Sequence, residues 1–128
     1  MGAEERRRRL ERGRRAEEAA AAFAVSLGMR VVGRNVRVGR LEIDLVVHDG
    51  EVVVVIEVRT RGPGSWVGPL TSVDWRKRAR LRAAGESLWH TRYKSDPRLA
   101  RMRFDLMAVD LTGEAPRIEH VRAAFRCV

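Results

Sequence analysis

Residues 41–59 read LEIDLVVHDGEVVVVIEVR, two apolar runs on either side of Asp49-Gly50. Valine, isoleucine and leucine dominate both runs, and an Asp-Gly pair between two such runs is a strong hairpin signal. We therefore expect strands over 41–48 and 51–59, joined by a two-residue type I′ turn at Asp49-Gly50. This hairpin is the part of the sequence that decides the fold.

The expected hairpin gathers acidic side chains on one face. With Asp49-Gly50 as the loop, Glu42 faces Glu57, and Asp44 lies diagonally across from Glu57. Arg59 shares this face, because side chains alternate along a strand. The opposite face carries Ile43, Leu45, Val54, Ile56 and Val58.

Facing carboxylates repel each other and weaken a strand pair, so something must offset the charge. One interpretation is a bound divalent cation, for which oxygen ligands favour Mg²⁺ or Mn²⁺ over zinc. The other is a set of ordinary ion pairs with Arg37, Arg40 and Arg59. The Gly/Pro-rich segment 60–70, directly after the second strand, favours a site.

The remaining pattern completes an α/β domain. The other expected elements are a helix over 4–27 ended by Gly28, a strand over 30–38 with a bulge at Gly33, a helix over 71–94, a strand over 102–110 and a short strand over 116–122. A strand, a helix and a strand in succession imply a parallel pair. We expect one domain over 1–128, a mixed five-stranded sheet flanked by helices, with a basic segment, 1–12, that frays at its start.

Composition points to a polyanionic partner. The chain has 128 residues, with 26 Lys+Arg against 17 Asp+Glu, a formal net charge of +9 and a sequence pI of about 11.3. This excess favours nucleic acid, most simply DNA. Genomic bias is the alternative, since Lys77 and Lys94 are the only lysines.

Other features of the composition exclude several classes. No apolar run is long enough for a membrane span, and no signal-peptide pattern follows the basic N-terminus. The single cysteine, Cys127, cannot form an intramolecular disulfide. We expect a soluble cytoplasmic protein without a membrane partner, and a homodimer stays open.

The acidic residues resemble a known nuclease motif. Asp44 followed by Glu57-Val58-Arg59 is similar to the D…(D/E)xK arrangement of restriction-endonuclease-like nucleases. Further motifs run in order: Gly13 with Glu17, Asn35 with Arg37, Glu42-Ile43-Asp44-Leu45, Glu57-Val58-Arg59-Thr60-Arg61, Val73 with Lys77, Arg103-Phe104-Asp105 and Ala124-Phe125. Together they resemble the bacterial YraN family, small proteins of uncertain role whose fold is similar to that of archaeal Holliday-junction resolvases. The resemblance extends over nearly the whole chain.

The resemblance implies a restriction-endonuclease-like αβββαββ core and a Mg²⁺- or Mn²⁺-dependent endonuclease acting on DNA, with branched or flapped substrates favoured. It implies Asp44 and Glu57 as metal ligands and catalytic residues, with the backbone carbonyl of Val58 as a further ligand. Glu42 would assist at the metal, and Glu17 would approach from the first helix as a further catalytic residue.

Two residues depart from the family's pattern. Leu41 stands where the family has glycine before Glu42, and Arg59 stands where it has lysine. Arginine stays protonated and is a poor proton acceptor, although it can stabilise developing charge on a phosphate. Lys77, on the apolar stripe of the second helix, is a candidate replacement, but we favour a partner for a buried carboxylate or a surface lysine.

Basic side chains on both helices and the sheet would hold the phosphate backbone. The residues expected to do so are Arg14, Arg15, Arg37, Arg61, Arg76, Lys77 and Arg80. Two alternatives remain: a non-catalytic nucleic-acid-binding module that retains the nuclease fold, and a small RNA- or ribosome-associated basic protein. His48 is expected to be solvated at the hairpin tip, and Asp105 to make a structural ion pair with Arg103 or Arg61.

Overall fold

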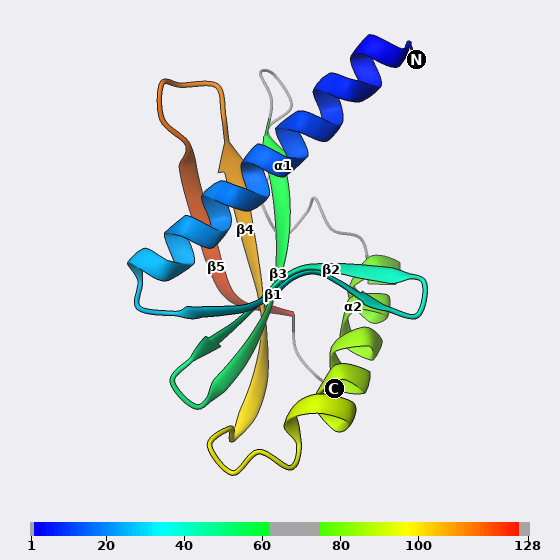
Figure 1. Ribbon diagram of the computed structural model, residues 1–128, viewed down its shortest axis with the longest axis vertical. Coiled ribbons are helices and arrows are strands. Elements are labelled where there is room, and N and C mark those ends of the chain that lie inside the picture. Colours follow the sequence, from blue (N-terminus) through cyan, green and yellow to red (C-terminus); the bar gives the residue numbers. More distant parts are fainter. Residues whose placement is uncertain (1, 62–74, 126–128) are drawn as a thin grey trace.

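The computed structural model describes residues 2–61 and 75–125, and the side chains of Arg61, Trp75 and Phe125 lie outside the description. The elements are α1 (Ala3–Ser26), β1 (Arg30–Val38), β2 (Leu41–Asp49), β3 (Val52–Arg61), α2 (Trp75–Leu88), a short π-helix η2 (Trp89–Tyr93), β4 (Arg101–Asp110) and β5 (Arg117–Phe125) (Figure 1). Their order confirms the predicted succession of helix, three strands, helix and two strands.

The five strands form one mixed sheet in the order β1-β2-β3-β4-β5. The pair β3–β4 is parallel, and the other three pairs are antiparallel. The predicted bulge is present as a register shift between Val31 and Gly33. The fold class predicted from the sequence is therefore confirmed, and β3, which carries Glu57, lies at the centre of the sheet.

The hairpin register differs from the prediction. His48 pairs with Val53 and Asp49 with Val52, so the loop is Gly50-Glu51 and not Asp49-Gly50. Gly50 takes a positive φ of 61° at the first loop position, as in a type II′ turn. The register moves by two residues, a shift that by itself leaves the alternation of faces unchanged but makes Asp44, not Glu42, the next residue opposite Glu57.

Helix α1 covers one face of the sheet through small side chains. Its buried residues are Ala16, Ala20, Ala21 and Ala24. Alanines at this helical spacing bring the helix axis close to the sheet, where it packs over Leu45, Val54 and Ile56. The buried stretch begins at Ala16, so the helix is anchored by its second half only.

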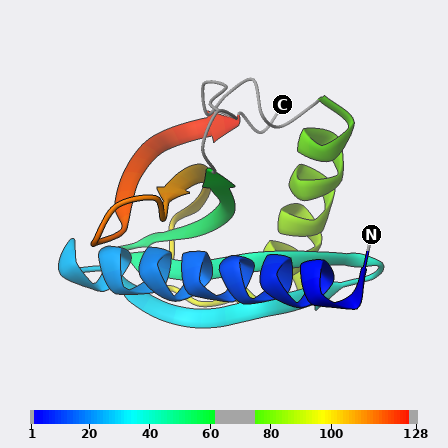
Figure 2. The same cartoon turned by 90° about the horizontal axis from the view of Figure 1, so that it is seen from above.

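Helix α2 covers the other face, so the sheet is the middle of three layers (Figure 2). The predicted stripe is confirmed for Leu81, Ala84 and Leu88, which are buried, while Val73 lies outside the described residues. A Cβ on Gly85 would lie 2.5 Å from the Phe104 ring, so only glycine allows this approach. Residues 89–93, expected to continue the α-helix, form the π-helical turn instead.

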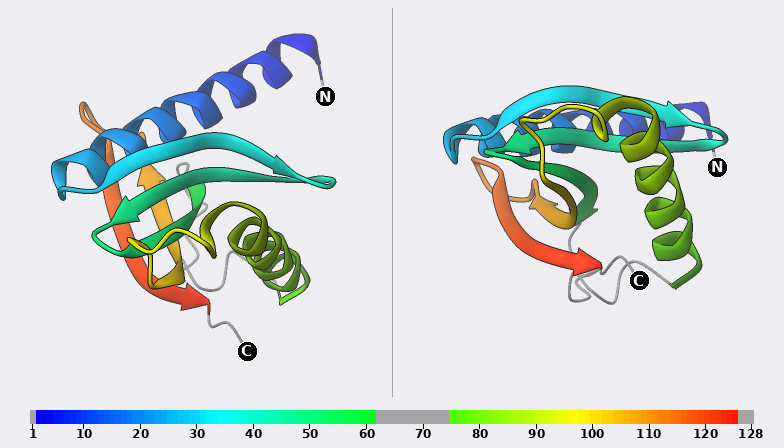
Figure 3. Two further views of the ribbon diagram at one scale, coloured as in Figure 1. Left: turned by 60° about the horizontal axis from the view of Figure 1, so that its bottom comes forward. Right: turned by 90° about the horizontal axis from the view of Figure 1, so that it is seen from below.

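The ribbon formed by β1 and β2 coils out of the sheet toward α2 (Figure 3). Pairing of β2 with β3 ends at Leu45 and Ile56, whereas β1 stays paired with β2 as far as Leu41. Two-stranded ribbons twist more strongly than broad sheets. As a result Ile43 packs in the cluster under α2 and not, as predicted, beside Leu45.

The helices of the described residues are too short or too charged to cross a membrane.

Candidate functional site

Asp44 and Glu57 meet where β2 leaves β3. The Asp44 carboxylate accepts a hydrogen bond from the backbone N–H of Val58 at 2.9 Å, on a stretch of β3 beyond the last β2–β3 pair. Its side chain is also hydrogen-bonded to Glu57, which is 3% exposed. Coiling of the β1–β2 ribbon thus places two carboxyl groups in contact on the α2 side of the sheet.

Two touching carboxyl groups cannot both ionise freely in such a setting. The pKa of Asp44 is raised to about 8, first because the group is buried and next because the charge of Glu57 repels a second negative charge. The Val58 amide acts in the opposite direction, and the charge of Glu17 adds a smaller upward effect. At neutral pH the pair therefore shares one proton.

Lys77 reaches the same pair from α2. Its Nζ lies 2.7 Å from Oε1 of Glu57, and the lysine side chain is 37% exposed while that of Glu57 is 4% exposed. The predicted interpretation of Lys77 as the partner of a buried carboxylate is confirmed. Because the Lys77 side chain is partly exposed, a ligand that approaches Glu57 from outside would also meet Lys77.

Glu17 and Glu42 form a second group beside the pair, held together by Asn35. The Asn35 side-chain amide donates to Oε1 of Glu17 at 3.0 Å and to Oε1 of Glu42 at 2.9 Å. Asn35 has a positive φ of 50°, a conformation that asparagine tolerates better than most residues. This contact ties α1 to the β1–β2 ribbon next to Asp44.

The predicted cluster of three carboxylates is not formed. In the described parts of the chain, no three His, Cys, Asp or Glu side chains come together in a way that could hold a metal ion. The reason is the hairpin register, which sets Asp44 opposite Glu57 and leaves Glu42 with Asn35. Two carboxylates remain, a set that fits Mg²⁺, since this ion keeps several waters and binds through one or two carboxylates plus phosphate oxygens.

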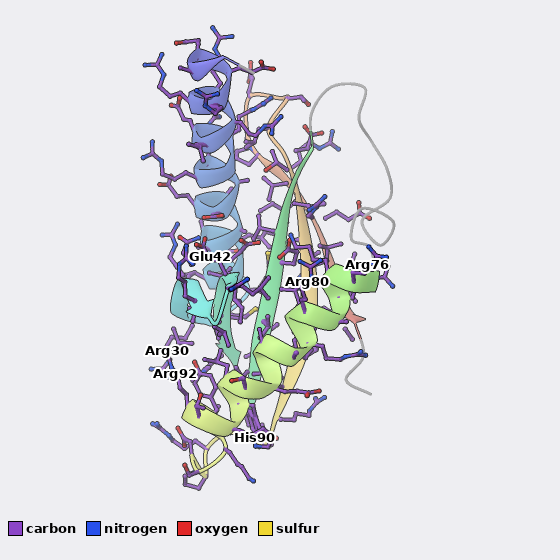
Figure 4. All side chains as sticks on the ribbon, turned by 90° about the vertical axis from the view of Figure 1, so that its right-hand side faces the viewer. Arg30, Glu42, Arg76, Arg80, His90 and Arg92 are labelled. Atoms are coloured by element: carbon purple, nitrogen blue, oxygen red, sulfur yellow. The ribbon has the colours of Figure 1, made fainter. Side chains whose placement is uncertain are left out.

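The predicted phosphate-binding residues lie on four elements, α1, β1, β3 and α2. Arg59 is half-buried on β3 two residues after Glu57, and Arg37 is exposed on β1. Arg76 and Arg80 are exposed on α2. Figure 4 shows the molecule from the side of α2 and labels these two arginines together with Glu42. The others are Arg14 and Arg15, exposed on α1, and Arg61, whose side chain lies outside the described residues.

The prediction of a solvated His48 is wrong. Its Nδ1 lies 3.2 Å from an Arg30 guanidinium nitrogen, its ring packs edge-on against Tyr93, and its Nε2 is buried without a hydrogen-bond partner in the described structure. Burial first, and then the charge of Arg30, lower the pKa of His48. The residue stands at the far end of β2 from Asp44 and takes no part in the site.

Asp105 is a buried carboxylate of a different kind. Arg103 donates to both of its oxygens at 2.8 and 3.0 Å, His120 lies 2.8 Å away, and the Ala123 N–H donates at 3.0 Å. These hydrogen bonds outweigh burial and lower the pKa of Asp105. The predicted structural ion pair with Arg103 is confirmed.

Sequence reasoning missed the role of Asn35. The residue was part of the family motif, but its bridge to Glu17 spans 18 positions of sequence and depends on a left-handed backbone conformation. The periodic spacing of apolar residues does not indicate a contact between two positions so far apart in the sequence. An asparagine at the middle of a predicted strand was the only signal available.

Comparison with known proteins gives consistent matches along the chain. The family model described as "Uncharacterised protein family UPF0102" matches residues 16–109. A UPF0102 protein of Sorangium cellulosum is 51% identical over 115 residues, 88% of this chain and 79% of that protein. UPF0102 proteins of Pseudomonas paraeruginosa and Halorhodospira halophila are 39% and 42% identical, over 90% and 91% of this chain and 92% and 88% of their own lengths.

Proposed function

Since the chain belongs to the uncharacterised protein family UPF0102, as its YraN-like motifs predicted, we propose that it is a divalent-cation-dependent nuclease that hydrolyses phosphodiester bonds of DNA. The family's description assigns no activity, so the proposal depends on the site alone. The restriction-endonuclease-like arrangement of helices around a mixed sheet is compatible with this chemistry but does not carry it.

The observation that carries the proposal is the contact between Asp44 and Glu57. Two carboxyl groups in contact, one of them almost fully buried, repel each other when both are ionised, and at neutral pH the pair holds a proton instead. A divalent cation between them would turn this repulsion into ligation. Asp44 and Glu57 would hold Mg²⁺ or Mn²⁺, with the Val58 carbonyl as a further oxygen. When bound, the ion supplies charge neutralisation at the scissile phosphate and a more acidic water.

Two cations of the chain complete the proposed chemistry. Lys77, 2.7 Å from Glu57, can orient the attacking water or hold a non-bridging phosphate oxygen. Arg59 follows Glu57 on the same face of β3 and can hold a phosphate with two parallel hydrogen bonds. Lys77 would position the attacking water and Arg59 would hold the phosphate, so arginine at position 59 is compatible with hydrolysis.

A second candidate function is a nucleic-acid-binding module without catalysis. The observation that favours it is the ion pair at 2.7 Å between Lys77 and Glu57, in which the lysine supplies a counter-charge for the buried carboxylate. In that case the Asp44–Glu57 pair has no catalytic role, and only the arginines contact the nucleic acid.

The test is cleavage of linear, flapped and four-way-junction DNA with Mg²⁺ or Mn²⁺. The wild-type chain should cut at least one substrate, and Asp44→Asn should abolish cutting while leaving DNA binding intact. Lys77→Met should reduce the rate by roughly 10²-fold or more, the usual effect of removing one preorganised electrostatic group. Wild-type DNA binding without cleavage of any substrate would favour the binding module.

Arg59→Lys provides the matched comparison. If Lys77 positions the water, this variant should keep the wild-type rate within about threefold and lose some affinity, because lysine cannot make the two parallel bonds. A large rise in rate would mean that position 59 is where the catalytic lysine belongs and that Lys77 is structural.

A further inference from the structure

We infer that the first half of α1, residues 3–15, is a DNA-binding arm that enters the major groove of a duplex next to the Asp44–Glu57 pair. We call this segment the α1 arm. The inference deepens the proposed function by naming a duplex as part of the substrate, and it rests on that function for the nucleic-acid partner.

The α1 arm stands clear of the fold. Every residue from 3 to 12 is exposed, and the first buried residue of the helix is Ala16. Figure 1 shows this half of the helix extending beyond the sheet. At 1.5 Å per residue the arm is roughly 20 Å long, a little more than half a turn of B-form DNA. A helical segment of this size that does not pack on the core is marginally stable in water, so a partner that binds it would stabilise it.

The charge of the arm selects that partner. It carries seven arginines, Arg6, Arg7, Arg8, Arg9, Arg12, Arg14 and Arg15, against three glutamates, Glu4, Glu5 and Glu11. Ion pairs of Arg7 and Arg8 with Glu4, at 2.7 and 3.5 Å, leave a large positive excess on the arm. Neighbouring like charges weaken an isolated helix, so neutralisation by phosphates would also stabilise this one.

The distribution of the arginines around the helix selects a groove over a flat surface. At roughly 100° per residue, one flank carries Arg7 and Arg14, and the other carries Arg8, Arg12 and Arg15, with Glu4 and Glu11 between the two flanks. Arg6 and Arg9 point toward the remaining side of the helix. A helix lying on one strand of phosphates would need a single basic face. A helix inside the B-DNA major groove has phosphates on both sides.

The groove also selects DNA over duplex RNA. The B-DNA major groove admits an α-helix, whereas the A-form major groove is too deep and narrow for side chains to read. Leu10 is 75% exposed and has no role in the fold, and in the groove it could contact a thymine methyl group.

The arm is attached close to the site. Glu17, two residues after Arg15, joins Asn35 and acts electrostatically on Asp44. A duplex held by the arm would therefore pass beside the Asp44–Glu57 pair. The substrate is then a DNA in which a double-helical segment adjoins the phosphate to be cut.

The test measures binding of the full chain in EDTA, so that cleavage plays no part. The arm variant combines Arg7→Gln, Arg8→Gln, Arg12→Gln and Arg14→Gln, two from each flank, since glutamine is nearly as good a helix former as arginine. The matched control combines Arg92→Gln, Arg101→Gln, Arg117→Gln and Arg122→Gln, which removes the same charge from exposed positions on other elements.

Fluorescence anisotropy with a B-form duplex should show at least a tenfold loss of affinity for the arm variant. Its salt slope should fall by about 0.9 for each phosphate contact removed. The control should lose less than about threefold. Equal losses in the two variants, or none in either, would overturn the inference.

Duplex RNA of the same sequence provides the second readout. The wild type should bind it more weakly than duplex DNA, and the arm variant should lose most of the difference. Equal wild-type affinity for the two duplexes would refute groove insertion. The two proposals can be rejected independently. If the arm variant loses DNA affinity but the wild type cleaves no DNA, only the proposed hydrolysis is rejected. If the wild type cleaves DNA but the arm variant keeps its affinity, only the role of the arm is rejected.

Discussion

The same sheet buries carboxyl groups in two ways. On the α1 side, Asp105 is 0% exposed and is surrounded by donors from Arg103, His120 and the Ala123 amide. On the α2 side, Glu57 is 3% exposed but faces a second carboxyl group, Asp44. The pKa of Asp105 is lowered and that of Asp44 is raised to about 8.

The difference separates a structural carboxylate from one available for chemistry. Asp105 has its hydrogen bonds satisfied inside the protein, so it stabilises the β4–β5 pair and has no capacity for a ligand. Asp44 and Glu57 compete for a single lysine and a proton, so the free protein holds them in an unfavourable arrangement. Perturbed carboxyl pairs of this kind are candidates for function because a ligand can relieve them.

The largest effect should come from breaking the satisfied carboxylate. Asp105→Asn leaves the half-buried guanidinium of Arg103 with only the more distant carboxylate of Asp49, at 3.5 Å, and should lower the free energy of unfolding by about 3 kcal/mol. Asp44→Asn keeps the Val58 hydrogen bond and, unlike Asp44, takes up no proton on folding at pH 7, so its stability should be unchanged or higher. Urea denaturation at pH 7 in EDTA measures both.

The critical result is which of the two variants has the lower free energy of unfolding. If Asp44→Asn destabilises the protein as much as Asp105→Asn, the Asp44–Glu57 pair is a structural element like Asp105. An Asp105→Asn protein that is already unfolded without urea agrees with the prediction, provided that Asp44→Asn is folded.

The pH dependence of stability sharpens the same contrast. Because the folded-state pKa of Asp44 is raised, the folded protein holds a proton that the unfolded chain releases at about pH 4. The associated stability is fully present below that pH and is lost as pH rises toward 8. Asp105 has the opposite sign: its stability is present above about pH 4 and is lost as acid protonates the folded state.

Between pH 6 and pH 8 only Asp44 of the two changes its charge. The wild type in EDTA should lose at most about 2–3 kcal/mol over this range relative to Asp44→Asn. The lowered pKa of His48 adds a slope of the other sign below its usual value, but both proteins share it. Parallel stability curves for the two proteins would show that Asp44 titrates normally.

Most of the fold could be predicted from the sequence because its signals are local. Valine-rich runs, the glycine after α1 and the apolar stripe of α2 fixed the elements and their order. The hairpin register could not be fixed, since glycine can occupy either loop position, and a shift of two residues keeps every side chain on the same face. The coil that moves Ile43 toward α2 arises from the loss of β3 as a partner, which no local pattern reports.

The site was predictable in part for the same reason. Facing strands brought Asp44 and Glu57 together under either register, and the helical stripe pointed Lys77 at the sheet. Glu42 was misplaced because its position depended on the register. The bridge made by Asn35 and the burial of His48 depend on packing between distant segments, so only the structure reveals them.

The most direct test of the central claim is the effect of Mn²⁺ on the melting temperature. The wild type should gain several degrees, since a ligand at a hundred times its dissociation constant stabilises by about 2.7 kcal/mol. The gain should be larger at pH 8 than at pH 6, because the ion must displace the proton on Asp44. Asp44→Asn should lose most of the gain, and the exposed control Glu86→Gln should keep it. A wild-type gain that Asp44→Asn retains in full, or no gain at either pH, would contradict the account.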